Sequence, residues 1–202
     1  MMNESSYEER IGRRGLLHFV AGLLPRLRLW LRFSYNRRKA IRRGAKIGKN
    51  TVILSGLVRR ANANLVIGDE CSIGTAKLDS RSPVHIGDHV IISNDSEIIT
   101  TSHHIDSSEW EHKHYGITIE DYVWIASDAL VLPSCRRIGY GAVIGAGAVV
   151  VRDVPPMSVM GGNPACRIKQ RRQVHDRLVI PSLLSGDLPI YWRTWMNRRK
   201  RK

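Results

Sequence analysis

The histidines of this chain are the side chains best suited to chemistry at neutral pH, and they are unevenly placed. Six of the eight fall within residues 85–114: His85, His89, His103, His104, His112 and His114. An imidazole has an ordinary pKa of about 6.5, so it can take a proton from a poorly nucleophilic group and return it later. Grouped imidazoles can also bind zinc. The cluster therefore indicates either acid–base catalysis or a metal site.

The positive charge lies mainly toward the two ends of the chain. The net charge is +14, and residues 10–68 hold fifteen Lys or Arg and no Asp or Glu. A second basic cluster occupies residues 198–202. Such a distribution attracts polyanions, namely nucleic acid, anionic lipid or acidic polysaccharide.

The spacing of aliphatic residues predicts the scaffold that positions the histidines. An aliphatic residue recurs every six positions at Ile119, Ile125 and Val131, and again at Ile138, Ile144 and Val150. This period fits neither an α-helix nor the two-residue alternation of a strand. It is typical of a parallel β-helix, in which the aliphatic residue points into one coil and stacks on its equivalent in the next. The fold class is therefore expected to be all-β.

The same rhythm covers much of the chain, with two interruptions. It begins at Ile41, pauses at residues 59–64, and can be followed through these positions: Ile41, Ile47, Ile53, Ile67, Ile73, Asp79, Ile86, Ile92 and Ile98. Asp79 is a misfit, because a carboxylate stands where an aliphatic residue is expected. The next triplet starts about fifteen residues late, so a loop over residues 103–118 is thrown out of the coil. Long loops in a regular scaffold are usually functional.

The segment before the repeats reads as a basic, amphipathic helical arm. Residues 16–33 mix Leu, Phe, Val and Trp with arginines, and Pro25 should divide them into two short helices. Such an arm can lie in a membrane interface, or it can pack on the open end of the β-helix and hide its edge. We expect three parts: a helical arm at 1–40, a β-helix at 41–168 and a basic C-terminal extension at 169–202.

Cysteine usage and hydropathy indicate the compartment. The three cysteines have no metal-binding spacing and favour a reducing environment. The longest apolar run, residues 16–24, is too short to span a bilayer, and no small-residue cleavage site follows it. We therefore expect a cytoplasmic protein, with peripheral contact at the inner face of the membrane as one role of the basic arm.

Residues 67–171 resemble the hexapeptide-repeat acyltransferases, especially sugar O-acetyltransferases of the maltose and galactoside acetyltransferase type. Three strings carry the resemblance: IITTSHHID at 98–106, VWIASDALVLP at 123–133, and IGYGAVIGAGAVVVRDVPPMSVMGGNPACRI at 138–168. The basic N-terminal segment is similar to the capsule, colanic acid and O-antigen branch. The resemblance implies a left-handed β-helix, a homotrimer with active sites between subunits, acetyl-CoA as donor and no metal.

The string IITTSHHID aligns His103 with the catalytic histidine of that family. The family usually has Pro where this chain has His104, which leaves His104 as the alternative base. Asp95, Asp106 or Glu120 can orient the imidazole. The expected substrate-binding residues are Asp95, Trp110 and Trp124: Trp124 falls where the family has an aromatic residue near the acceptor or pantetheine arm, and Trp110 in the loop can stack on a sugar ring. Trp110 can instead anchor the loop, and Trp124 can lie at a subunit contact.

The matching C-terminal strings imply the donor site. A backbone N–H at Ala126 or Ser127 is the expected oxyanion donor. The small residues Gly145 and Ala146 let the pantetheine arm approach the coil. The remaining cofactor-binding residues are basic and can pair with the phosphates of coenzyme A: Arg152, Arg167 and Lys169.

Together these features predict an acetyl-CoA-dependent O-acetyltransferase acting on a sugar hydroxyl, in surface polysaccharide biosynthesis. N-acetylation of an amino sugar carried on a nucleotide is the first alternative, because acceptor choice depends on the irregular loop. A zinc enzyme like the gamma-type carbonic anhydrases is a weaker alternative, since the histidine spacing does not fit. A non-catalytic scaffold that binds a polyanion is the last. No nucleic-acid partner is expected.

Overall fold

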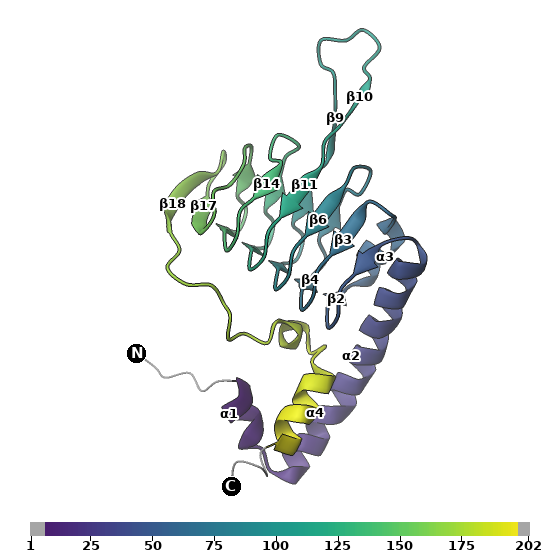
Figure 1. Ribbon diagram of the computed structural model, residues 1–202, viewed down its shortest axis with the longest axis vertical. Helices are drawn as coiled ribbons and strands as arrows, with labels where there is room; N and C mark the ends of the chain where they lie inside the picture. The colour runs from purple at the N-terminus through teal and green to yellow at the C-terminus, as the bar shows by residue number, and fades with distance from the viewer. Residues whose placement is uncertain (1–6, 198–202) are drawn as a thin grey trace.

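A computed structural model describes residues 7–197, so the basic cluster at 198–202 lies outside the described residues. Short strands stack into three parallel sheets that form the sides of a coil (Figure 1). The first sheet contains β1 (Lys46–Ile47), β3 (Leu65–Ile67), β6 (Val84–Ile86), β11 (Ile117–Ile119) and β14 (Arg137–Ile138). The second contains β2 (Val52–Ile53), β4 (Ser72–Ile73), β7 (Ile91–Ile92), β12 (Trp124–Ile125), β15 (Val143–Ile144), β17 (Ser158–Gly161) and the antiparallel β18 (Cys166–Gln170). The third contains β5 (Lys77–Leu78), β8 (Glu97–Ile98), β13 (Leu130–Val131) and β16 (Val149–Val150).

The predicted stacking of aliphatic residues is confirmed in the core. Ile92, Ile125 and Ile144 occupy one register across β7, β12 and β15, and all three are buried. The glycines and aspartates of the repeat form the corners. The Asp88 N–H donates to the Asp121 carboxylate at 2.8 Å, and a Cβ at Gly87 would lie 2.1 Å from that carboxylate. Glycine at this corner therefore makes room for the carboxylate of the next coil.

Two positions depart from the predicted rhythm. Leu78 is the buried residue of its side, paired with Ile98, so the chain reaches it five residues after Ile73 instead of six. Asp79 consequently lies just past the strand, where its carboxylate can bond to neighbouring groups. Ile41 belongs to a helix and is 40% exposed, so the β-helix begins at β1 and not at Ile41. The helix extends this far because its last turns pack on the first coil.

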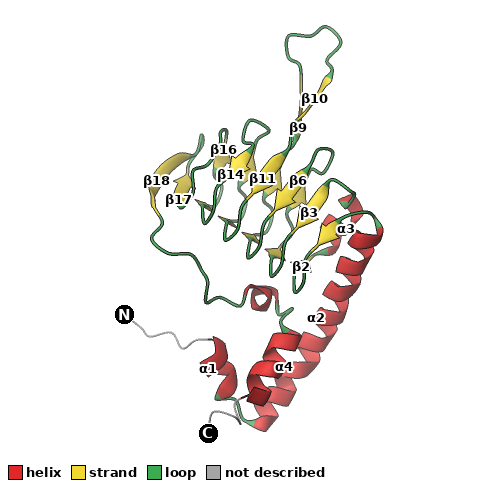
Figure 2. Ribbon diagram, viewed as in Figure 1, coloured by secondary structure: helices red, strands yellow, loops and turns green. Residues whose placement is uncertain are grey.

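The expected break at Pro25 is wrong, because α2 (Leu16–Arg42) runs through it as one helix. Pro25 is exposed, and the helix is held by packing on both sides of it, at Phe19 and at Phe33. Tertiary contacts thus outweigh the cost of the missing N–H. The other helical elements are α1 (Tyr7–Gly12), α3 (Ser55–Arg60), the 3-10 helix η1 (Ile180–Leu184) and α4 (Leu188–Asn197). Figure 2 shows α3 and one end of α2 at the start of the coil, with α1 and α4 beside the other end of α2.

The C-terminal half of α2 caps the first coil. The Asn36 side-chain amide donates to the Ile53 carbonyl at 3.0 Å, and the Arg37 guanidinium donates to the Ile47 and Gly48 carbonyls, each at 2.8 Å. These side chains satisfy carbonyls at the end of the solenoid, which would otherwise be an open edge. The N-terminal half of α2 extends past the coil and packs with α1 and α4 around Phe19. Among the described residues, no helix is long and apolar enough to cross a bilayer.

Candidate active site

The histidine-rich loop is a β-hairpin that projects from the coil. β9 (Thr101–His103) and β10 (His112–His114) pair antiparallel, with His103 opposite His112 (Figure 1). The chain leaves the third sheet after β8 and returns to the first sheet at β11. The extruded segment therefore starts two residues earlier than predicted and ends before Ile117.

His103 is held in one orientation by the hairpin. Its Nδ1 lies 2.7 Å from the Trp110 carbonyl oxygen, and the Trp110 ring stacks on the imidazole with centroids 5.0 Å apart. A carbonyl can only accept, so Nδ1 carries the proton of this hydrogen bond, and in the neutral ring the lone pair is on Nε2. Trp110 has a positive φ of 54°, an uncommon backbone conformation for a residue other than glycine. A neutral histidine in this tautomer can act as a base through Nε2.

His104 lacks this arrangement. Its backbone N–H donates to the Glu111 carbonyl at 3.0 Å, and its exposed ring has no hydrogen bond within residues 7–197. The two neighbouring histidines thus differ in one respect: a backbone carbonyl orients the ring of His103, and no described carbonyl orients the ring of His104.

None of the three carboxylates expected to orient the imidazole does so. Asp95 accepts from the Thr75 hydroxyl at 3.0 Å, and Glu120 pairs with Arg137 and with the Tyr140 N–H. Asp106 is exposed near the tip of the hairpin. The orienting group is the Trp110 carbonyl, which sequence reasoning missed because a backbone acceptor leaves no signal in residue types.

The root of the hairpin is fixed by Asp79, a second residue that sequence reasoning missed. Its carboxylate accepts from the Thr101 hydroxyl at 2.9 Å, the Thr100 N–H at 3.1 Å and the Arg81 guanidinium at 2.8 Å. Burial alone would raise the pKa of Asp79, but the hydrogen bonds from Arg81, Thr101 and Thr100 outweigh it and lower the pKa well below its ordinary value. The carboxylate that interrupts the six-residue repeat at this position was the feature of the sequence that could have indicated this role.

The small residues predicted for the donor site lie together at one corner of neighbouring coils. Ala126 and Ser127 follow β12, Gly145 and Ala146 follow β15, and the Gly147 N–H donates to the Ser127 carbonyl at 3.0 Å. The Ala126 N–H is already used by the Ile144 carbonyl at 2.9 Å, so it is wrong as an oxyanion donor. The Ser127 N–H donates to no other described residue. We use the name corner row for four residues: Ala126, Ser127, Gly145 and Ala146.

The predicted acceptor residues do not converge within one chain. Trp124 lies on the outer face of β12, 43% exposed, and its indole N–H donates to the Ser93 hydroxyl at 3.3 Å. Asp95 occupies the corner beyond Ser93 with φ 58°. Trp110 belongs to the hairpin and lies against His103. Trp124 and Asp95 therefore lie near the corner row, whereas Trp110 lies beside His103, the predicted base.

The predicted basic residues flank the last coils. Arg152 is exposed just after β16, while Arg167 and Lys169 are exposed on β18, opposite Met160 and Val159 of β17. β18, which carries Arg167 and Lys169, belongs to the same sheet as β12 and β15, whereas Arg152 follows the last strand of the third sheet. The charges of the three residues are available to an anion that lies along this edge.

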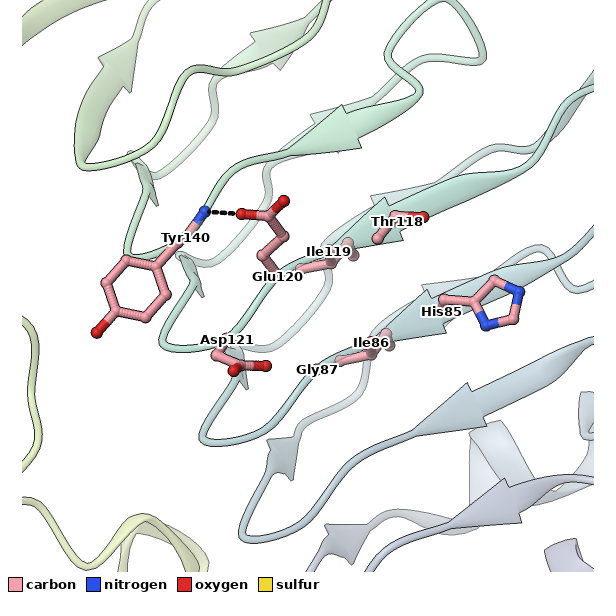
Figure 3. Close-up of a pocket in the computed structure, with 8 residues that line it drawn as sticks. All are labelled: His85, Ile86, Gly87, Thr118, Ile119, Glu120, Asp121 and Tyr140. Atoms are coloured by element: carbon pink, nitrogen blue, oxygen red, sulfur yellow. Dashed lines mark hydrogen bonds between the residues drawn. The ribbon is translucent and has the colours of Figure 1, made fainter.

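A shallow groove of about 320 Å³ crosses the first sheet, lined by His85, Thr118, Glu120, Asp121 and Tyr140 among others (Figure 3). Figure 3 shows the Glu120 carboxylate bonded to the Tyr140 N–H, and Asp121 accepts from the Asp88 N–H. Its two carboxylates are thus engaged within the chain. No predicted catalytic residue lies in this groove. In the described part of the chain, no group of three His, Cys, Asp or Glu side chains could hold a metal ion.

His103 and the residues predicted for the donor site are separate in a single chain. The hydrogen bonds and ring contacts of His103 within residues 7–197 go to Trp110 and His112 of its own hairpin. None joins it to the corner row. His103 thus lies on a hairpin that projects from the coil (Figure 1).

Comparison with known proteins agrees with this architecture. No protein-family model matches the chain. The chain is 36% identical over 129 residues to WcaF of Escherichia coli K12, named as an acetyltransferase of colanic acid biosynthesis, and the match covers 63% of this chain and 70% of WcaF. It is also 36% identical over 120 residues to galactoside O-acetyltransferase of the same organism, covering 58% and 52%.

A solved galactoside acetyltransferase in complex with coenzyme A has a similar fold. The TM-score is 0.54 at 24% identity, and the match covers 76% of this chain and 82% of that one. The fold is the left-handed parallel β-helix of about six turns that these enzymes share. This chain therefore belongs to the hexapeptide-repeat acetyltransferase family.

Proposed function

We propose that this protein transfers an acetyl group from acetyl-CoA to a hydroxyl of a sugar in surface polysaccharide biosynthesis. The names of two relatives, in colanic acid biosynthesis and galactoside O-acetylation, support this class of acceptor. The observation that carries the proposal is the orientation of His103, whose Nδ1–H is bonded to the Trp110 carbonyl while Nε2 remains free to accept a proton.

His103 acts as the general base. Its Nε2 removes the proton of the acceptor hydroxyl as the oxygen attacks the thioester carbonyl carbon. The tetrahedral intermediate then collapses, the carbon–sulfur bond breaks, and the imidazolium returns its proton to the leaving thiolate. The products are the acetylated sugar and free coenzyme A. The Trp110 carbonyl keeps the tautomer and stabilises the imidazolium that forms in between.

The corner row and the basic edge hold the donor. The Ser127 N–H is the oxyanion donor, because the Ala126 N–H is used in the coil ladder. Gly145 and Ala146 let the pantetheine arm lie close to the coil. Arg152, Arg167 and Lys169 pair with the phosphates of coenzyme A, and Asp95, Trp110 and Trp124 contact the acceptor.

The active form is a homotrimer in which the hairpin of one subunit reaches the corner row of the next. The separation of His103 from the corner row within one chain supports this arrangement. In this arrangement the base of one subunit acts on the thioester bound by the next.

The protein works in the cytoplasm, at the inner face of the membrane. The absence of acidic residues from positions 10–68 supports contact with anionic lipid. Acceptors carried on a lipid phosphate would be presented at that surface.

The test is a pair of adjacent substitutions. His103→Ala should lower the rate of coenzyme A release in the presence of a sugar acceptor by about 100-fold or more, with the KM for acetyl-CoA little changed. His104→Ala is the matched control and should cost much less. The reverse order would make His104 the base. A panel of hydroxyl and amino-sugar acceptors tests the acceptor, and selective turnover of an amine would replace O-acetylation by N-acetylation.

A further inference from the structure

Helix α2 carries a second apolar face that the other described residues, 7–197, leave uncovered. Its members are exposed by 42–84% of their surface, and we call them the leucine face: Leu17, Val20, Leu24, Leu27 and Leu31. Single exposed leucines are ordinary, but a continuous row on one helix marks an interaction surface.

The spacing of three and four residues places this face in one line along the helix. The row spans about 21 Å at 1.5 Å per residue. Phe19, Phe33 and Ala40 define the buried side, which packs on α4 and the first coil. The leucine face points away from that side, so it contributes nothing to the cores of the molecule.

The charges around the face identify the partner. α2 contains seven Lys or Arg and no acid, and Arg28 and Arg32 are exposed beside the leucines. A second copy of α2 docked here would bring these like charges together, with no carboxylate from residues 10–68 to pair with them. An anionic bilayer offers both an apolar interior for the leucines and phosphates for the arginines.

Helix α4 extends the same end of the molecule. Its Trp192 and Met196 are exposed by 51% and 45%, and the Trp192 ring lies 5.8 Å from Phe19 of α2. Tryptophan suits the headgroup region, since one end of its ring system is apolar and the other is wet. Trp192 thus adds an exposed aromatic side chain on a neighbouring helix, beside the part of α2 that carries Phe19.

We infer that the leucine face is a docking surface for an anionic membrane, with α2 lying in the plane of the bilayer. The leucines enter the acyl boundary, while Arg28 and Arg32 reach the phosphates. Because the opposite side of α2 caps the first coil, that coil is the part of the β-helix nearest the membrane. This inference names the surface for the membrane contact proposed above and rests on that proposal. It does not depend on the acetyl transfer.

The experiment is co-sedimentation of the full-length protein with vesicles. Vesicles of phosphatidylcholine with phosphatidylglycerol should retain the wild type at low salt and release it as salt rises, because screening weakens the attraction. Vesicles of phosphatidylcholine alone should retain little. The triple variant Leu17→Gln, Leu24→Gln, Leu31→Gln should bind the anionic vesicles about tenfold more weakly or worse. Circular dichroism checks its fold, and Leu24→Gln alone serves if the triple variant does not fold.

A matched control removes exposed leucines elsewhere. Leu178→Gln with Leu183→Gln should bind vesicles as the wild type does, since neither lies on the leucine face. If the triple variant binds as well as the wild type, the surface is wrong while membrane contact stands. If the wild type does not bind anionic vesicles, the proposed membrane contact and the docking surface are both wrong, and the proposal of acetyl transfer is unaffected. If sedimentation velocity without lipid shows that the triple variant forms smaller oligomers, the face joins copies of the chain and the inference is overturned.

Discussion

Residues 7–197 form two buried clusters, and the two are built in different ways. The β-helix core is aliphatic and repetitive, with Ile92, Ile125 and Ile144 stacked coil on coil. The helical cluster is aromatic: Phe19 of α2 stacks between Tyr191 at 5.0 Å and Trp195 at 4.0 Å, both from α4.

The helical cluster also encloses a charge. Asp187 is fully buried, with the Arg26 guanidinium donating to it at 3.1 Å and the Tyr7 hydroxyl donating to its other oxygen. Burial, and then the hydrogen bond to Asp187, raise the pKa of Tyr7 far above its ordinary value, so this hydroxyl remains a donor. The β-helix thus gains stability from many equivalent contacts, whereas the helical cluster depends on a few contacts that cannot replace one another.

Removal of the buried carboxylate should produce the largest difference in stability between the helical cluster and the β-helix. Asp187→Ala leaves the Arg26 charge without its partner, and we expect the helical cluster to lose about 3–5 kcal/mol of local stability. Hydrogen exchange of α1 and α4 measures it, with the β-helix amides as the internal reference. Asp187→Asn keeps an acceptor and should cost less. Equal loss of protection in the coils would mean that the two clusters unfold as one unit.

The contrast also explains what the sequence could predict. In the coils the partner of each residue is the next repeat, so period alone indicated Ile125 and Ile144 as core residues. The partners of Asp187 are 161 and 180 positions away, and no local pattern announces them. The predicted helix break at Pro25 is wrong for the same reason, because contacts with residues distant in sequence hold α2 as one helix. In the site, residue types indicated His103, but the Trp110 carbonyl that orients it is a matter of backbone geometry.

A second prediction concerns the repetitive core. Ile125→Ala removes a fully buried side chain between two others, and we expect a loss of about 2–5 kcal/mol, against about 0.5–1.5 kcal/mol for Ile125→Val. Urea unfolding followed by far-UV circular dichroism measures both. Exchange at α4 should stay unchanged. A cost at α4 comparable to that in the coils would contradict the independence of the two clusters.

A third prediction concerns the hairpin that carries His103, which is attached to the regular coils through Asp79. Asp79→Asn keeps the shape but loses the charge that strengthens the bonds to Thr100 and Thr101, and we expect kcat to fall about tenfold with the KM for acetyl-CoA unchanged. The matched control is Asp69→Asn, which removes a carboxylate that accepts from the Lys49 N–H between coils far from the hairpin. Equal losses in the two variants would indicate general weakening of the coil instead of a displaced base.

The smallest expected effect lies in residues 171–186, which join the two clusters. The Arg171 guanidinium donates to His175 Nδ1 at 2.9 Å, and His175 Nε2–H donates to the His89 carbonyl at 2.9 Å. The ring is therefore neutral. Burial lowers the pKa of His175, and the nearby Arg171 and His89 lower it further, while the bond to the His89 carbonyl and the charge of Asp176 oppose the change.

The direction of the pH dependence follows from that lowered pKa. Between the folded pKa and the ordinary value of about 6.5, the unfolded segment binds a proton that the folded one does not, so stability falls as pH drops through this window. Protonation at Nδ1 would also set a cation against the Arg171 guanidinium. We expect amide exchange in residues 172–179 to rise a few-fold between pH 7.5 and pH 5.5, after correction for intrinsic rates. His175→Gln should abolish this dependence. Neither buried cluster contains a histidine among the described residues, so both should keep their protection over the same range. A similar loss of protection at Ile125 or Tyr191 would mean that the titrating group acts on a buried cluster and not on residues 171–186.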